Sequence, residues 1–256
     1  MRLALMQAPP TVTPARAVNR LSDAAAEAKA SGADLLVTPE MYLSGYAVGR
    51  AALDERESAL DAGLWAAAAE IAAKHKIAIL VGGPEVGGFN TVAFFDATGE
   101  LVSSYRKTHL YGDVDRAQFT AGDSLSEVFE FCGLRCALAI CFDIEFPELA
   151  RSLARRGAEV LLVPTANMQP YTGVATRLVP ARAHENGVAI GYANFTGPDG
   201  TFDYCGLSCI VGPNGEDLAR ASDATGLVIA DIDRDDVTRV RADIDYLSQT
   251  RTELYE

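Results

Sequence analysis

Short apolar segments typical of buried strands alternate with amphipathic, helix-like segments from one end of this chain to the other. The first strand-like segment, residues 2–8, is followed by a helical pattern that starts at Pro14, and a second strand-like segment follows at residues 34–38. Strands that alternate with helices are typical of βα units, which bury each apolar strand between layers. The pattern therefore predicts a layered α/β protein.

Further along, the sequence predicts a strand at residues 77–81 that is closed by Gly82-Gly83-Pro84, and a loop at residues 111–122. The other predicted strands are 91–96, 101–107, 128–131, 134–140, 160–164, 188–194, 205–211 and 227–232, and the other predicted helices are 60–71, 148–156 and 176–185. The tail after Arg234 is charged and less regular. Because no linker or repeat interrupts the 256 residues, we expect one domain, 1–256, with sheets sandwiched between helices.

The composition excludes some classes of partner and indicates the cellular compartment. A net charge of −13 disfavours nucleic acid and anionic membranes as partners, because the field of the protein repels polyanions. No apolar run approaches the roughly 18 residues of a membrane span, and the N-terminus turns polar too soon for a signal peptide. Five cysteines without a CxxC pair argue against disulfides and zinc, so we expect a cytoplasmic protein that binds no metal.

Cys141 is placed where a cysteine can be reactive. It follows the apolar run 137–140 and precedes a polar turn that leads to a helix. A thiol at a strand end near a helix start lies where the backbone dipoles favour the thiolate, so we expect Cys141 to have a lowered pKa. Two other predicted strands end at residues with useful chemistry, Glu40 and Lys107. Together the three indicate an enzyme.

A cysteine hydrolase also needs a group that transfers protons and a group that stabilises an oxyanion. His109, two residues beyond Lys107, is the one of the three histidines that fits a Cys–His pair. Glu40 is the alternative base, because burial at the end of an apolar strand would raise its pKa toward the useful range. Lys107 supplies a point charge that can bind an oxyanion and keep Glu40 ionised.

These residues lie in motifs that resemble the nitrilase superfamily of carbon–nitrogen hydrolases. Pro39-Glu40 fits the first motif of that family, residues 105–110 fit its lysine motif, and residues 140–148 fit its nucleophile motif. Further matches lie at residues 164–167, 182–186, 206–208 and 211–215, in the order of the family. The resemblance covers nearly the whole chain and implies a single-domain α-β-β-α sandwich.

The resemblance also implies a role for each residue. Cys141 would be the nucleophile, and Glu40 would be the general base and later the acid. Lys107, with the backbone N–H of Phe142, would stabilise the tetrahedral intermediate.

Many members of the family have a second glutamate four residues before a Phe-x-x-Gly sequence. Asp115 occupies that place here, before Phe119 and Gly122, and is the fourth predicted catalytic residue. Because aspartate is shorter than glutamate, Asp113 is kept as the alternative.

Residues 105–116 and 164–168 are similar to amidases that act on 5-aminopentanamide and to R-stereoselective amidases of cyclic amino-acid amides. In both groups of substrates a carboxamide lies some distance from an amine, which requires an acceptor in the site. We predict Glu145 as this acceptor, with Asp203 as the alternative. The other predicted substrate-binding residues are Tyr42, Phe142, Asn167 and Tyr171, with Phe195 as a further apolar wall.

The resemblance thus implies a cysteine-dependent amidase that hydrolyses a small carboxamide through a thioester and needs no cofactor. The alternatives are a nitrilase, an N-carbamoyl amine amidohydrolase, a transferase that passes the acyl group to an amine or lipid, and a non-catalytic scaffold. Family members commonly form homodimers or larger assemblies, so we expect a homo-oligomer to which the tail after Arg234 contributes.

Overall fold

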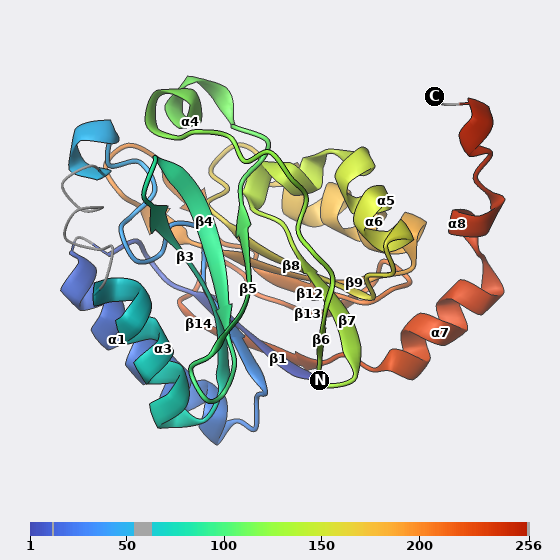
Figure 1. Ribbon diagram of the computed structural model, residues 1–256, viewed down its shortest axis with the longest axis horizontal. Helices are drawn as coiled ribbons and strands as arrows, with labels where there is room; N and C mark the ends of the chain where they lie inside the picture. The colour runs from blue at the N-terminus through green and yellow to red at the C-terminus, as the bar shows by residue number, and fades with distance from the viewer. Residues whose placement is uncertain (12, 54–62, 255–256) are drawn as a thin grey trace.

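Two six-stranded sheets lie face to face between two layers of helices (Figure 1). The structure is a computed structural model and describes residues 1–11, 13–53 and 63–254. The strand order is β14-β1-β2-β3-β4-β5 in the first sheet and β13-β12-β9-β8-β7-β6 in the second. This arrangement confirms the predicted α-β-β-α sandwich.

The first sheet has a parallel centre, β1-β2-β3, with antiparallel strands on both sides. Its strands are β1 (Arg2–Gln7), β2 (Leu35–Val37), β3 (Ala78–Glu85), β4 (Phe89–Phe95), β5 (Leu101–Arg106) and β14 (Gly226–Asp231). Helices α1 (Pro14–Ala30) and α3 (Gly63–His75) cover its outer face. Thr13 caps α1 by accepting a hydrogen bond from the backbone N–H of Arg16, as its position before Pro14 favours.

The second sheet repeats this plan, with β7-β8-β9 parallel at its centre. Its strands are β6 (Phe129–Phe131), β7 (Leu134–Leu138), β8 (Val160–Thr165), β9 (Ala189–Asn194), β12 (Cys209–Val211) and β13 (Asp217–Arg220). Helices α5 (Pro147–Arg155) and α6 (Val179–Asn186) pack on its outer face. Between the sheets, side chains such as Leu5, Leu80, Leu138 and Leu162 form one fully buried core.

Short elements complete the chain. They are α4 (Gly112–Gln118), the 3₁₀ turn η1 (Cys141–Glu145), the π-helical turn η2 (Val174–Leu178), the hairpin of β10 (Thr196–Pro198) and β11 (Asp203–Cys205), and the C-terminal α7 (Arg234–Asp243), α8 (Tyr246–Gln249) and η3 (Thr252–Leu254). No helix in the described part of the chain has the length and apolar character that crossing a bilayer requires.

Several predicted elements differ from the structure. The predicted loop at 111–122 contains α4, and the predicted strand 205–211 is broken into β11 and β12 because Gly206 and Leu207 both adopt positive φ angles, of 62° and 59°. The predicted helix 176–185 starts with the turn η2, and strands β10 and β13 were missed. Of the predicted helix 60–71, residues 60–62 lie outside the described residues.

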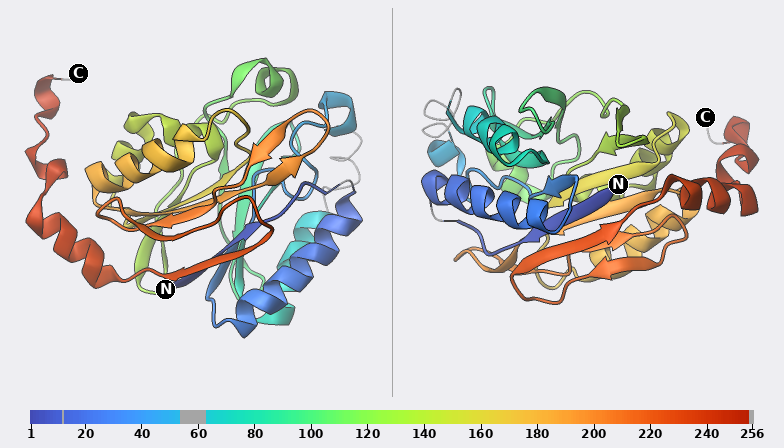
Figure 2. Two further views of the ribbon diagram at one scale, coloured as in Figure 1. Left: turned by 180° about the vertical axis from the view of Figure 1, so that it is seen from behind. Right: turned by 90° about the horizontal axis from the view of Figure 1, so that it is seen from below.

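The tail after Arg234 is more regular than predicted. Asp233 caps α7 by accepting a hydrogen bond from the backbone N–H of Asp235. The guanidinium group of Arg241 then ties the helix to the body, because it donates to the backbone oxygens of Ala158 and Gly187 at 2.6 and 2.9 Å. Beyond it, α8 contacts α5 and α6, and the tail follows this side of the molecule (Figure 2).

The Gly82-Gly83-Pro84 sequence does not close a strand as predicted but lies within β3. A Cβ atom at Gly82 would lie 2.6 Å from the backbone nitrogen of Met41 and 3.0 Å from the backbone oxygen of Pro39. The glycine therefore lets the turn that carries Glu40 approach the strand closely, which is a packing requirement and not a turn signal.

Replacing Gly82→Ala should destabilise the fold by about 1–3 kcal/mol, since the added methyl group forces two backbones apart. Turnover should fall as well, because the turn that shifts carries Glu40. Denaturant unfolding and initial rates measure both effects.

Gly63→Ala is the matched control, because no atom lies within 4 Å of the Cβ position there. We expect its stability to stay within about 0.5 kcal/mol of the wild type. A Gly82→Ala protein with unchanged stability and rate would contradict this account of the close approach.

Candidate active site

Residues at the ends of three strands from both sheets meet at one end of the sandwich. Glu40 follows β2 and Lys107 follows β5 in the first sheet, while Cys141 follows β7 in the second. The Nζ atom of Lys107 lies 2.7 Å from Oε1 of Glu40, and both side chains are fully buried. The charges of both residues act on the Cys141 thiol. The structure thus brings together the three residues that the sequence singled out.

Asp115 also contacts Lys107. Its Oδ2 atom lies 2.7 Å from Nζ of Lys107 and accepts a hydrogen bond of 2.8 Å from the backbone N–H of Tyr111. Its Oδ1 atom accepts a hydrogen bond of 2.6 Å from the hydroxyl group of Tyr46. Asp113, the alternative, is exposed and pairs with Arg116 instead. The short aspartate reaches Lys107 because the predicted loop is folded into α4.

Glu40 has the environment of a proton acceptor. Its Oε1 atom binds Lys107 and accepts a hydrogen bond of 2.7 Å from the side-chain amide of Asn90. No group among the described residues donates to its buried Oε2 atom. Burial raises the pKa of Glu40 above its ordinary value, while the charge of Lys107 opposes this rise. One carboxylate oxygen thus stays free to take up a proton.

Lys107 carries its charge in a site without water contact. Burial by itself lowers the pKa of a lysine, but the carboxylate of Glu40 and the other neighbouring groups outweigh it, so the pKa of Lys107 is raised well above its ordinary value. The ring of Tyr46 lies 5.6 Å from the Nζ atom. Lys107 is therefore a permanent cation beside the thiol.

Cys141 is the first residue of η1 and has a φ angle of 47°, a left-handed conformation that is unfavourable for residues with a side chain. Burial and the charge of Glu40 raise the pKa of the thiol, and Lys107, Thr165 and the backbone N–H of Ala166 oppose this only in part. The expected lowering of the Cys141 pKa is thus wrong. In this site the proton leaves the sulfur only if a nearby base accepts it.

Asp143 holds the turn that presents Cys141. Its carboxylate is fully buried and accepts hydrogen bonds from the backbone N–H of Ile140 at 3.0 Å and from the hydroxyl group of Tyr105 at 2.9 Å. It also binds His109, through the backbone N–H at 2.9 Å and through Nδ1 at 2.8 Å. His109 therefore braces the turn and is committed to Asp143, which leaves Glu40 as the candidate base.

A pocket of about 200 Å³ opens beside the thiol. It is lined by Tyr46, Tyr111, Cys141, Phe142, Glu145, Ala166, Asn167, Met168 and Tyr171. Five of these residues were predicted from the sequence. Asn167 stabilises the wall of the pocket, because its side-chain amide donates a hydrogen bond of 3.0 Å to the backbone oxygen of Tyr171.

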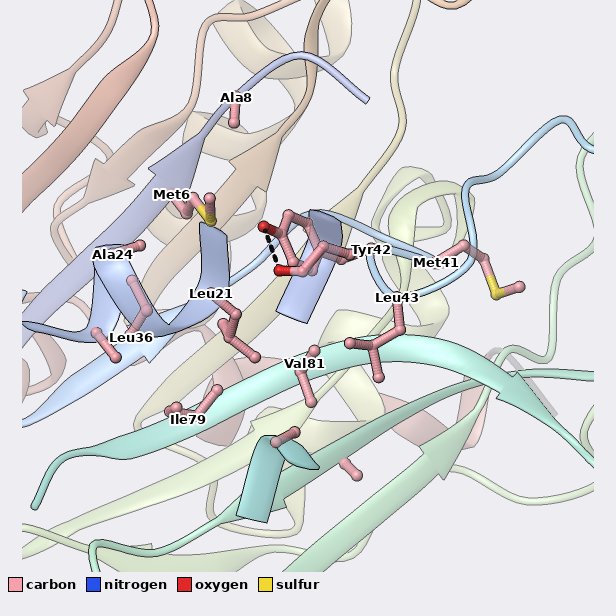
Figure 3. Packing of buried hydrophobic residues seen from close by; sticks show 14 of the residues in the cluster. Met6, Ala8, Leu21, Ala24, Leu36, Met41, Tyr42, Leu43, Ile79 and Val81 are labelled. Atoms are coloured by element: carbon pink, nitrogen blue, oxygen red, sulfur yellow. Dashed lines mark hydrogen bonds between the residues drawn. The ribbon is translucent and has the colours of Figure 1, made fainter. Parts of the chain in front are cut away.

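Other predicted residues lie outside this pocket. Tyr42 is fully buried in the core beneath α1, among Leu21, Met41 and Leu43, where its hydroxyl group donates to the backbone oxygen of Ala17 at 3.2 Å (Figure 3). Its predicted contact with substrate is therefore wrong. Phe195 stacks on Tyr42, with 6.4 Å between the ring centroids, and does not line the pocket. Asp203 is exposed on β11 and does not line it either.

The comparison with known proteins agrees with this geometry. A model of the carbon–nitrogen hydrolase family matches residues 2–242. The chain belongs to this family. It is thereby a member of the nitrilase superfamily and a hydrolase of carbon–nitrogen bonds other than peptide bonds, as the sequence predicts.

Named relatives include amidases. The chain is 44% identical to a protein of Pseudomonas protegens described as "hydrolase in pqqF 5'region", over 100% of this chain and 91% of the relative. It is 35% identical to an (R)-stereoselective amidase of Pseudomonas sp (87% and 81% covered) and 32% identical to a 2-oxoglutaramate amidase of Bacillus subtilis (90% and 89% covered).

Solved structures of an amidase from Nesterenkonia sp. AN1 have the same fold. One has a TM-score of 0.85 at 36% identity and covers 100% of this chain and 98% of the amidase. Another, a Glu-to-Gln variant with a TM-score of 0.87 at 34% identity, covers 100% of this chain and 95% of the amidase. It shows the acetamide moiety of fluoroacetamide added covalently at the active-site cysteine of that protein.

Sequence reasoning missed several residues of this carbon–nitrogen hydrolase site. Tyr46 and Asn90 bind the carboxylates of Asp115 and Glu40, yet neither directly follows a predicted strand, which is the position that drew attention to the other residues. Tyr111 lies in the predicted loop 111–122, just after the lysine motif, and its position there was a usable signal, since it lines the pocket with Cys141. No cluster of three His, Cys, Asp or Glu in the described residues is arranged to hold a metal ion.

Lys107→Met should destabilise the fold by about 3–5 kcal/mol, because it leaves two buried carboxylates without their cation. Activity should fall at least about 100-fold. The destabilisation should be smaller at pH 5 than at pH 8, since protonation relieves the repulsion between the unpaired carboxylates. Urea unfolding at the two pH values measures the effect.

Lys74→Met is the control, because Lys74 is an exposed lysine in the last turn of α3. We expect it to unfold at the urea concentration of the wild type. Equal stability of the Lys107→Met and Lys74→Met proteins would show that Lys107 does not hold the two carboxylates.

Proposed function

We propose that this carbon–nitrogen hydrolase is a cysteine-dependent amidase that converts a small carboxamide to the carboxylic acid and ammonia. The observation that carries the proposal is the contact of Lys107 with both Glu40 and Asp115, next to a half-buried thiol at the mouth of a pocket. The structure of the Nesterenkonia amidase with a group attached to its cysteine supports covalent catalysis at Cys141.

The first half of the reaction forms a thioester. The Cys141 sulfur attacks the carboxamide carbon while its proton passes to Glu40, whose free Oε2 atom and raised pKa suit it as the base. The oxygen of the tetrahedral intermediate becomes negative and is stabilised by the ammonium of Lys107 and the backbone N–H of Phe142. Glu40 then gives its proton to the leaving nitrogen, and ammonia departs.

The second half hydrolyses the thioester. Glu40, ionised again, takes a proton from a water molecule, and the resulting nucleophile attacks the thioester carbon. The same two groups stabilise the second oxyanion. The tetrahedral intermediate then collapses: the bond between carbon and the Cys141 sulfur breaks, Glu40 returns its proton to the sulfur, and the carboxylic acid leaves. Asp115 acts on Lys107, which it holds in place together with Glu40. No step requires a cofactor.

For the substrate we propose an ω-amino amide, such as 5-aminopentanamide, or a cyclic amino-acid amide. The supporting observations are the size of the pocket, the carboxylate of Glu145 in its wall, and the likeness to an (R)-stereoselective amidase. A nitrilase and an N-carbamoyl amine amidohydrolase would use the same three residues. Ammonia release from an amide, its matching nitrile and its N-carbamoyl counterpart separates the three activities. The homo-oligomer and the cytoplasmic location stay predictions.

Glu40→Gln tests the two roles of the base. It should lower steady-state ammonia release by about 10²–10⁴-fold, since neither proton transfer nor water activation is assisted. Cys141→Ala should lower it at least as much and, unlike Glu40→Gln, should form no covalent adduct with substrate. Intact-mass measurement during turnover detects the thioester. An adduct on the Cys141→Ala protein, or ammonia release from it above about one part in a hundred, contradicts covalent catalysis at the thiol.

The pH dependence follows from the raised pKa of Glu40. Only the ionised carboxylate accepts the proton of the thiol, so activity is lost as the pH falls through the pKa. Because this pKa lies above the ordinary value of 4.5, the acid limb of the kcat/KM profile should have an apparent pKa above 4.5. A profile that stays flat down to pH 4.5 would exclude Glu40 as the base.

A further inference from the structure

Glu145 is a carboxylate in the pocket wall that has no counter-ion of its own. It is half-buried and lines the same pocket as Cys141. Among the described residues, no side chain forms an ion pair or a hydrogen bond with its carboxylate group. Arg182 donates instead to the backbone oxygens of Ile144 and Glu145, at 3.2 and 2.8 Å, and pairs with Glu185.

The charges around the pocket do not balance. The single ammonium of Lys107 is already bound by Glu40 and Asp115. With Glu145, three carboxylates therefore lie around the single ammonium of Lys107. Burial raises the pKa of Glu145, and the more distant charges of Lys107 and Arg182 offset this only in part. A carboxylate that has lost part of its water and gained no partner favours the binding of a cation.

Aromatic rings border the same part of the pocket. The ring of Tyr111 meets Phe142 edge-on, with centroids 5.4 Å apart, and meets Tyr171 in the same manner at 6.2 Å. All three residues line the pocket with Glu145. Aromatic faces attract ammonium groups through their quadrupoles, and this attraction grows where water is excluded. The rings and the carboxylate of Glu145 thus line one pocket, and both kinds of group attract cations.

We propose that Glu145, with the rings of Tyr111, Phe142 and Tyr171, binds a protonated amine of the substrate and selects amino amides over amides that carry a carboxylate. The inference rests on the proposed amidase function and deepens it. On this inference, the substrate preference of this chain differs from that of its relative named 2-oxoglutaramate amidase, because oxoglutaramate bears a carboxylate that Glu145 would repel.

The same turn fixes the distance between the two ends of the substrate. Cys141 and Glu145 are the first and last residues of η1, so their backbone positions lie about 8 Å apart along the axis of the turn at the usual 3₁₀ rise. Asp143 holds the start of this turn and Arg182 holds its end. Because the nucleophile and the carboxylate cannot move apart, the enzyme should prefer one chain length in a series of ω-amino amides.

Three substrates of similar size test the inference: 5-aminopentanamide, the neutral hexanamide and the anionic glutaramate. In the wild type, kcat/KM should be highest for 5-aminopentanamide. In Glu145→Gln, its advantage over hexanamide should fall about tenfold to hundredfold, the worth of a hydrogen bond between charged groups. Glu145→Lys should shift the preference toward glutaramate.

Glu148→Gln is the matched control, because Glu148 is exposed in the first turn of α5, three residues along the chain. Its substrate preference should equal that of the wild type. If Glu145→Gln lowers kcat/KM equally for all three amides, Glu145 is a structural residue and the inference is overturned.

A measurement on the wild-type protein tests the inference even if the variants fold poorly. Pentylammonium should inhibit hydrolysis of hexanamide at least about tenfold more strongly than 1-pentanol does. Equal inhibition by the two would overturn the inference. A wild type that hydrolyses hexanamide but prefers glutaramate also overturns it and leaves the amidase function intact, whereas failure to hydrolyse any carboxamide overturns the proposed function itself.

Discussion

The ion pairs of Lys107 with Glu40 and Asp115 are the interaction on which the active site depends. Each N···O distance is 2.7 Å and every side chain involved is fully buried. Such a group is costly to bury, because three charges lose their hydration at once. It persists because the side chains of Asn90 and Tyr46 and the backbone N–H of Tyr111, just before α4, donate hydrogen bonds to the carboxylates. The polar network thus fixes the relative positions of β2, β5 and α4.

The raised pKa of Cys141 is a consequence of the same network. Burial, and next to it the charge of Glu40, raise the pKa of the Cys141 thiol, and the charge of Lys107 offsets this only in part, which favours the neutral thiol. In the proposed mechanism, this arrangement couples activation of the thiol to protonation of Glu40.

The sequence was sufficient for the layers of the fold and for the residues at strand ends. Apolar runs identify the strands, and a polar or reactive residue directly after such a run is visible in the sequence, which is why Glu40 and Cys141 were found. It was not sufficient where long-range packing decides the structure. Gly82 looked like a turn residue because its close neighbour, the turn after Glu40, is invisible in a linear pattern. Tyr42 looked like a pocket residue because the direction of a side chain depends on that same turn.

The electrostatic prediction for Cys141 failed for a related reason. A helix start is a local feature that a sequence reveals, whereas burial and the approach of Glu40 are properties of the assembled sheets. The local dipole favours the thiolate, but the tertiary environment outweighs it. Glu145 and Tyr171, by contrast, belong to segments near Cys141 in sequence or sheet, and both line the same pocket as Cys141.

The division of the site between the two sheets has a mechanical consequence. Glu40 and Lys107 belong to one sheet and the sulfur to the other. The distance between the carboxylate and the thiol is therefore set by the apolar layer that includes Leu80 and Leu138, together with the few hydrogen bonds that cross between the sheets, such as the one from the backbone N–H of Glu40 to the backbone oxygen of Thr165 at 3.2 Å. Slippage of one sheet over the other by a fraction of an ångström separates the reacting groups while every strand remains intact. The catalytic rate therefore responds to smaller changes in the spacing between the sheets than any spectroscopic signal of secondary structure does. On heating, the enzyme should lose activity before its secondary structure unfolds.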